Sequence, residues 1–126
     1  MPNYIDGFVL PVPRDRLDEY KFLVEAVAAI WKEHGALEYC EHVGDDLKRV
    51  GTRSFIDLVA ATEDDIIVFG WVVFDSREAR DLANEKVATD PRMADLIDSS
   101  NSGFDAKRMA FGGFQSFVRS SNANAS

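Results

Sequence analysis

The residues best suited to acid–base chemistry lie at the end of the first predicted helix, where Trp31, His34 and Glu38 follow one another closely. An imidazole titrates near neutral pH and can act as a general base, and a neighbouring carboxylate can orient its ring. We therefore predict that His34 is a catalytic base and Glu38 its orienting partner. Because Gly35 breaks the helix between them, the alternative is a structural histidine and a glutamate exposed on a strand.

A second group of residues is suited to ligand binding. Asp6 lies inside a predicted central strand, where an unpaired charge is unfavourable, so we expect Lys107 or Arg108 of the last strand to pair with it. This pair is either a structural ion pair or a site for a polar group of a ligand. Trp31 and Trp71 are the predicted walls of an apolar cleft, with core packing as the alternative for Trp71. Arg108 is the predicted anchor for an anionic group.

Metal and thiol chemistry receive little support from the sequence. Cys40 lies between Glu38 and His42 on one strand face, and a nearby carboxylate disfavours the thiolate that a nucleophile needs. We therefore expect a buried, inert thiol. His42 is followed by Asp45 and Asp46, but two carboxylates in a turn are more typical of a solvated surface than of a metal site. We expect neither a metal nor a cofactor.

The elements that must position these residues follow the order strand, helix, strand, strand, helix, strand. Apolar residues recur every three or four positions through the first helix, and those of the strands fall on both faces. This order predicts an α+β fold, namely a ferredoxin-like unit with an antiparallel sheet. The expected ranges are strands at 4–12, 36–43, 66–74 and 107–118, helices at 14–34, from the Ser76 cap to Val87 and from Pro91 to Ile97, and a strand-like stretch at 54–60 that either continues the second strand or forms a separate arm.

The pattern also predicts how the chain assembles. Residues 3–118 form one predicted domain and residues 119–126 a predicted disordered tail. A strand that is apolar throughout, as 66–74 is, is typical of burial on both faces. The helices of one chain can cover only one face of the sheet. We therefore predict a homodimer that buries the second face, as in a dimeric α/β barrel.

Composition narrows the classes of partner. The chain has 22 acidic and 14 basic residues and a formal charge of -8, which disfavours nucleic acids and anionic membrane surfaces. It contains one cysteine and therefore no internal disulfide, as is typical of a reducing compartment. We see neither a leader peptide nor an apolar run of the roughly 18 residues that a membrane helix needs. The expected location is the cytoplasm.

Several short motifs together resemble the YbaA-like family, a domain of unknown function. They are the segments at 6–9, 11–13, 31–39, 44–46, 90–93 and 104–114, which spread over about residues 3–118. The resemblance implies the dimeric α/β-barrel superfamily and implies no established reaction.

Two functions remain open at this point. The first is a small-molecule enzyme that performs acid–base or cofactor-free oxidative chemistry in a cleft between helices and sheet. The second is a non-catalytic, dimeric ligand-binding or interaction protein.

Overall fold

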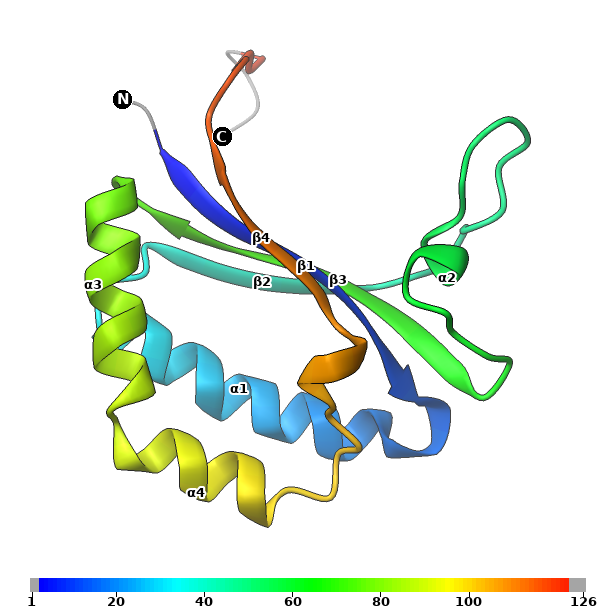
Figure 1. Cartoon of the computed structure of the whole chain (residues 1–126), viewed down its shortest axis with the longest axis horizontal. Helices are drawn as coiled ribbons and strands as arrows, with labels where there is room; N and C mark the ends of the chain where they lie inside the picture. Colours follow the sequence, from blue (N-terminus) through cyan, green and yellow to red (C-terminus); the bar gives the residue numbers. More distant parts are fainter. Residues whose placement is uncertain (1–2, 123–126) are drawn as a thin grey trace.

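The computed structural model describes residues 3–122 and consists of a four-stranded antiparallel sheet with its longer helices on one side (Figure 1). The strand order is β2-β3-β1-β4, which is the ferredoxin-like order, so the predicted α+β class is confirmed. The strands are β1 (Tyr4–Pro13), β2 (Glu38–Val43), β3 (Asp65–Phe74) and β4 (Ala110–Gln115), and the helices are α1 (Leu17–Glu33), α2 (Phe55–Leu58), α3 (Arg77–Ala88) and α4 (Pro91–Ser99), with short 3-10 turns at Arg14–Arg16 and Ala106–Arg108.

Local sequence signals explain where the helices begin and end. The Ser76 side chain accepts a hydrogen bond from the Ala79 amide, and Asp90 accepts one from the Arg92 amide, so both predicted helix caps are present. α1 ends at Glu33, and Gly35 has a φ of +117°, which a residue with a side chain rarely adopts. This turn directs the chain from α1 into β2.

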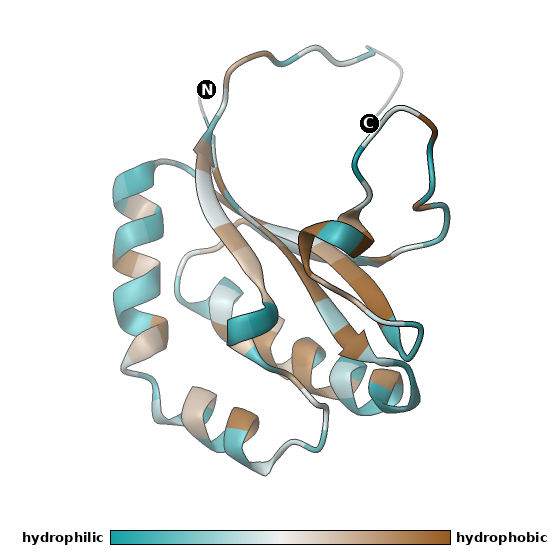
Figure 2. Ribbon diagram, turned by 45° about the vertical axis from the view of Figure 1, so that its right-hand side comes forward, coloured by the Kyte–Doolittle hydropathy of each residue, from teal (hydrophilic) through white to brown (hydrophobic). Residues whose placement is uncertain are grey.

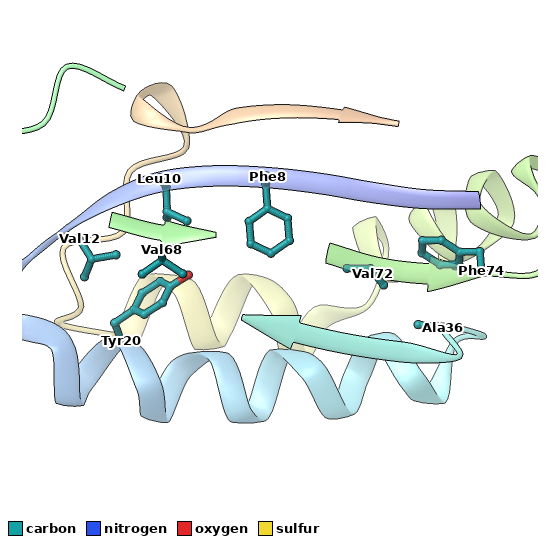
Figure 3. Packing of buried hydrophobic residues seen from close by; sticks show 9 residues of the cluster. Phe8, Leu10, Val12, Tyr20, Ala36, Val68, Val72 and Phe74 are labelled. Carbon is teal, nitrogen blue, oxygen red and sulfur yellow. The ribbon is translucent and has the colours of Figure 1, made fainter. Parts of the chain in front are cut away.

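One face of the sheet forms the main core against the helices. Phe8, Leu10 and Val12 of β1 point toward α1, and Val68, Val72 and Phe74 of β3 lie on the same side (Figure 3). Tyr20 of α1, Ala36 between α1 and β2, and Ala83 of α3 complete the buried cluster. Figure 2 shows hydrophobic colour along the central strands and mostly hydrophilic colour on α3. The helix-covered face therefore provides the apolar setting of any site in the cleft.

The second face of the sheet is covered at one end by the excursion between β2 and β3. The stretch at 54–60, which we predicted to be strand-like, contains the short helix α2 because Ser54 caps it by accepting the Ile56 amide. Val59 packs on Val9 and Ile67 there. Farther along this face, Phe69 and Phe114 are 41% and 58% exposed. Within one chain, β3 is therefore more deeply buried on the helix-covered face than on the other.

The last predicted strand is shorter than the pattern at 107–118 suggested. A 3-10 turn occupies Ala106–Arg108, because Asp105 caps it through the Lys107 amide, and β4 ends at Gln115. Of the predicted tail at 119–126, residues 123–126 lie outside the described part of the chain. Within residues 3–122, no helix has the length and apolar character needed to cross a membrane.

Candidate functional site

An apolar cavity of about 200 Å³ lies between the helix-covered face of the sheet and helices α1 and α4. The sheet forms its floor, and α4 contributes Met93 and Ile97 to its rim. The cavity is lined by Asp6, Phe8, Tyr20, Leu23, Val24, Val27, Trp31, Tyr39, Glu41, Val72, Met93, Ile97, Phe104, Met109 and Phe111. Its ionisable groups are therefore two carboxyls and two tyrosine hydroxyls.

Glu41 is the centre of a hydrogen-bonded cluster in the cavity wall. Tyr39 and Glu41 are two residues apart on β2, so both side chains point to the helix-covered face. The Tyr39 hydroxyl donates to Glu41 Oε2 over 2.6 Å, and the Tyr20 hydroxyl of α1 donates to Glu41 Oε1 over 2.5 Å. We call these three residues the Tyr–Glu–Tyr cluster. It connects the edge strand to the long helix at the mouth of the cavity.

The environment of this cluster raises the pKa of all three groups. Burial raises the pKa of Glu41 above its ordinary value, although the hydrogen bonds from Tyr20 and Tyr39 act in the opposite direction. Burial, followed by the nearby Glu41 charge, raises the pKa of both tyrosines. A carboxylate with a raised pKa is a stronger base than an exposed one and is therefore suited to accept and release a proton.

The Tyr–Glu–Tyr cluster also faces the outside of the molecule. A groove of about 600 Å³ runs between α1 and the edge strand β2. Tyr20, Val24, Tyr39 and Glu41 line this groove as well as the cavity. Glu41 therefore lies between the cavity and the groove.

The second carboxyl of the cavity, Asp6, is 1% exposed and forms an ion pair that we did not predict. Arg80 of α3 donates from Nη1 to Asp6 Oδ1 over 2.9 Å, so the expected partners Lys107 and Arg108 were wrong. Among residues 3–122, Asp6 Oδ2 has no hydrogen-bond partner. Burial raises the pKa of Asp6, and the charge of Arg80 opposes this shift. An unsatisfied buried polar atom costs about 1–3 kcal/mol, so such atoms are rare in native proteins.

The structure does not bring the predicted pair His34 and Glu38 together. His34 Nε2 lies 2.9 Å from Asp90 Oδ2 at the start of α4. Glu38 instead accepts a hydrogen bond from Trp71 Nε1 over 3.1 Å. The reason is strand alternation, because Glu38 is adjacent to the inward-facing Tyr39 and so points to the second face. Neither predicted catalytic residue belongs to the cavity lining.

The predicted binding residues are divided between the two faces. Trp31 lines the cavity as expected, as does Asp6. Trp71 lies on the second face, where its ring stacks on His42 with centroids 4.9 Å apart, so it is not a wall of this cavity. Arg108 donates from Nη2 to Asp65 Oδ2 over 2.7 Å, at the end of the sheet where β3 begins. It therefore forms a structural ion pair away from the lining residues.

Two important residues, Glu41 and Arg80, were missed although each carries a signal in the sequence. Glu41 shares the strand parity of Tyr39 and is thus a charged residue at an inward position. Arg80 lies three residues before the buried Ala83, on the apolar stripe of α3. In both cases a charge interrupts an otherwise apolar face, and such interruptions indicate a buried polar partner.

Among residues 3–122, no group of three or more histidine, cysteine, aspartate or glutamate side chains is placed to hold a metal ion. Cys40 is partly buried and reduced, and its thiol donates to Glu38 Oε1 over 3.3 Å. Burial and the Glu38 carboxylate raise the pKa of this thiol, which makes it a weak nucleophile.

Solved structures with the same architecture include two bacterial proteins. Rv0793 from Mycobacterium tuberculosis has a TM-score of 0.53 at 13% identity, with 96% of this chain and 100% of that chain covered. SnoaB from Streptomyces nogalater, described as a cofactor-independent oxygenase, has a TM-score of 0.53 at 10% identity, with 96% and 98% covered. At these identities the likeness shows the fold alone, which is a ferredoxin-like α+β fold.

The chain also has close sequence relatives. It is 40% identical over 116 residues to an uncharacterised protein, YbaA of Escherichia coli strain K12, covering 92% of this chain and 97% of the relative. The family described as "Protein of unknown function (DUF1428)" matches residues 3–106. The family match spans most of the chain, and the similarity to YbaA extends over nearly the full length of both proteins. This protein therefore belongs to the DUF1428 family, as the resemblance of its short motifs predicted.

Proposed function

We propose that this chain is a small-molecule enzyme that performs acid–base chemistry without a cofactor in the cavity between α1, α4 and the sheet. The observation that carries the proposal is a partly buried carboxyl, Glu41, which accepts two tyrosine hydroxyls in the wall of a mostly apolar cavity of about 200 Å³. A protein cavity of about 150 Å³ is large enough to bind benzene. The proposed substrate is therefore a compound with a single ring and small substituents.

The proposed step is a proton transfer through the Tyr–Glu–Tyr cluster. Each tyrosine hydroxyl donates to Glu41 and keeps a free lone pair on its oxygen. An acidic O–H or C–H of the substrate gives its proton to a tyrosine oxygen, and that tyrosine's own proton passes to the Glu41 carboxylate. The products of this step are a substrate anion and a neutral Glu41. The groove beyond β2 then offers the path by which Glu41 returns its proton to solvent.

An oxidative version of the reaction begins with the same step. A substrate anion is richer in electrons than its parent and can react with dioxygen, which would be the oxidant, without a bound cofactor. The fold shared with SnoaB supports this version by analogy alone.

The second candidate is a non-catalytic binding protein. Both oxygens of Glu41 already accept a hydrogen bond, and this saturation is what a purely structural carboxyl would show. In this case the cavity holds a ligand but the cluster moves no proton.

We further propose that the protein acts as a homodimer in the cytoplasm. The exposed Phe69 and Phe114 on the second sheet face support a partner surface. The single cysteine supports a reducing compartment, and the charge of -8 argues against nucleic acids and anionic membranes as partners.

The proposed function can be tested by deuterium uptake in D₂O, which does not require knowledge of the natural substrate. Cyclohexanone and 4-hydroxycyclohexanone are single-ring compounds whose protons beside the carbonyl exchange when a base removes them. We expect the wild-type protein to accelerate this exchange, as followed by proton NMR. Glu41→Gln should slow the protein-dependent exchange by at least about 100-fold, which is the lower end of general-base contributions.

The matched control is Glu85→Gln, which removes an exposed carboxylate on α3 and should leave the exchange rate unchanged. Binding of the ketones without accelerated exchange would support the non-catalytic alternative. Acceleration that survives Glu41→Gln would show that another residue is the base.

A further inference from the structure

We infer that Asp6 is a specificity-determining residue whose free oxygen Oδ2 accepts a hydrogen bond from the ligand. The cavity would then select single-ring compounds that carry a hydroxyl or amino group. This inference rests on the proposed function of the cavity and adds the chemical class of its ligand.

The first observation is that a buried oxygen of Asp6 has no hydrogen-bond partner within residues 3–122. This oxygen is Oδ2, and Asp6 is 1% exposed and lines the cavity. The oxygens of Glu41, the other carboxyl of the lining, each accept a hydrogen bond from a tyrosine. A buried acceptor without a donor is expected to receive one from outside the chain.

The second observation is that the other oxygen of Asp6 is held by an ion pair with Arg80. Arg80 donates to Oδ1 over 2.9 Å and also donates from Nη2 to the Tyr4 hydroxyl over 3.1 Å. The Arg80 guanidinium lies over the Tyr4 ring, 4.9 Å from its centroid. A Cβ atom at Gly113 would lie 2.2 Å from the Tyr4 hydroxyl, so the glycine makes room for this arrangement. A binding group fixed by such support loses little entropy when a ligand arrives.

The third observation concerns the charge that the ligand can carry. The lining contains the carboxyls of Asp6 and Glu41 and no lysine, arginine or histidine within the described part of the chain. Arg80, which contacts the lining residue Asp6, is already bound to Asp6 and Tyr4. Phosphate and carboxylate ligands would therefore meet repulsion without compensation. The expected ligand is therefore uncharged and carries a hydrogen-bond donor, as phenols and anilines do.

The fourth observation is that the two carboxyls come from strands that are not neighbours. Asp6 is on β1 and Glu41 on β2, and β3 separates them with an offset of two residues in register, so their backbones are about 12 Å apart. A single ring between them can donate to Asp6 at one end and face the Tyr–Glu–Tyr cluster at the other. Recognition and proton transfer are thus assigned to different residues.

The inference can be tested on the wild-type protein with phenol, toluene and anisole as probes. These compounds share one ring, and phenol alone has a donor group. Titration calorimetry or ligand-observed NMR should give at least about tenfold tighter binding of phenol than of toluene or anisole. Equal affinities for the three would overturn the inference while leaving an apolar binding cavity in place. Binding of none of them would overturn both the inference and the proposed function.

Asp6→Asn provides a sharper test because it reverses the chemistry at one atom. The amide oxygen must face Arg80, which only donates, so the NH₂ group occupies the place of Oδ2. We expect phenol to lose at least about tenfold in affinity and the acceptor anisole to become the better ligand. An unchanged preference for phenol would show that another group recognises the hydroxyl.

The matched control is Asp65→Asn, which alters another aspartate that is paired with an arginine and lies outside the cavity. It should leave the order of the three affinities unchanged, and the same reversal in this control would contradict the assignment to Asp6. Circular dichroism establishes that each variant is folded. If Asp6→Asn does not fold, the ratio of phenol to toluene affinity in the wild type decides the question.

Discussion

Asp6 and Glu41 bring carboxyl groups into the apolar interior, and each is stabilised in a different way. Glu41 accepts two tyrosine hydroxyls, whereas Asp6 is paired with one guanidinium. Burial raises the pKa of both residues. A group whose pKa is raised by folding stabilises the native state fully below its ordinary pKa. That contribution is lost as the pH rises through the raised value.

This linkage predicts a pH-dependent effect of Glu41→Gln on stability. Below the ordinary pKa of 4.5, wild-type Glu41 is protonated whether the chain is folded or unfolded, so the difference between the two proteins should be constant. Above it, the wild type loses stability relative to the uncharged variant, by about 1.4 kcal/mol for each unit by which the pKa is raised. Melting temperatures from pH 4 to pH 8 should therefore show a difference, variant minus wild type, that becomes more positive. Parallel melting curves would contradict the raised pKa.

Among the elements, α4 is joined to the end of α1 at Asp90, the residue that caps it. Asp90 caps the helix by accepting the Arg92 amide over 3.0 Å, and its other oxygen contacts His34 at the end of α1. Hydrogen bonds from Arg92 and then from His34 lower the pKa of Asp90. Every residue of α4 is at least partly exposed, yet the helix supplies Met93 and Ile97 to the cavity. The junction between His34 and Asp90 therefore positions one wall of the site.

This arrangement predicts a structural effect for His34→Ala. The variant loses one contact of α4, so amide hydrogen exchange in residues 91–99 should become faster and the melting temperature should fall. Asp90→Ala also removes the helix cap and should be more severe, by about 1–2 kcal/mol in urea unfolding. Phenol binding should survive in folded His34→Ala. If His34→Ala instead abolished phenol binding and left the stability unchanged, this result would support the catalytic role of His34 that the sequence suggested.

The order of elements could be predicted from the sequence because it depends on local patterns. Ser76, Asp90 and Gly35 mark helix ends, and the apolar stretch at 66–74 marks the strand β3. The prediction of a strand-like stretch at 54–60 was wrong. Its apolar residues suit a strand, but Ser54 caps a short helix there.

The partners of charged residues could not be predicted because they depend on packing between distant elements. Asp6 and Arg80 are 74 residues apart, and they meet only because α3 crosses β1. Glu38 and His34 are close in sequence, but strand alternation separates them. Trp31 could be placed in the cleft because the helical period alone determines its direction.

At the scale of the whole molecule, the two faces of the sheet are covered to different extents. Helices cover one face, while the excursion with α2 covers only one end of the other, around Val9 and Ile67. Phe69 stays 41% exposed there and contacts the rings of Phe55 and Trp71. Such an aromatic surface on a strand face is typical of an interface. We propose that a second copy of the chain covers it.

The proposed dimer predicts a mass of twice 14.1 kDa by light scattering at micromolar concentration. Phe69→Asp places a charge in the proposed interface and should yield monomers. Phe22→Asp changes another exposed phenylalanine, which is 76% exposed on α1, and should remain dimeric. A monomeric wild type, or equal behaviour of the two variants, would contradict the proposed interface.

The central claim is that the cavity between α1, α4 and the sheet is the ligand site. The most direct measurement is X-ray diffraction from crystals grown with 4-bromophenol, because anomalous scattering locates the bromine without reference to the protein. We predict one bromine peak inside the cavity, with the ring against Trp31 and Val72 and the hydroxyl at Asp6 Oδ2. A bromine peak only on the second sheet face or at the surface, with the cavity unoccupied, would contradict the account.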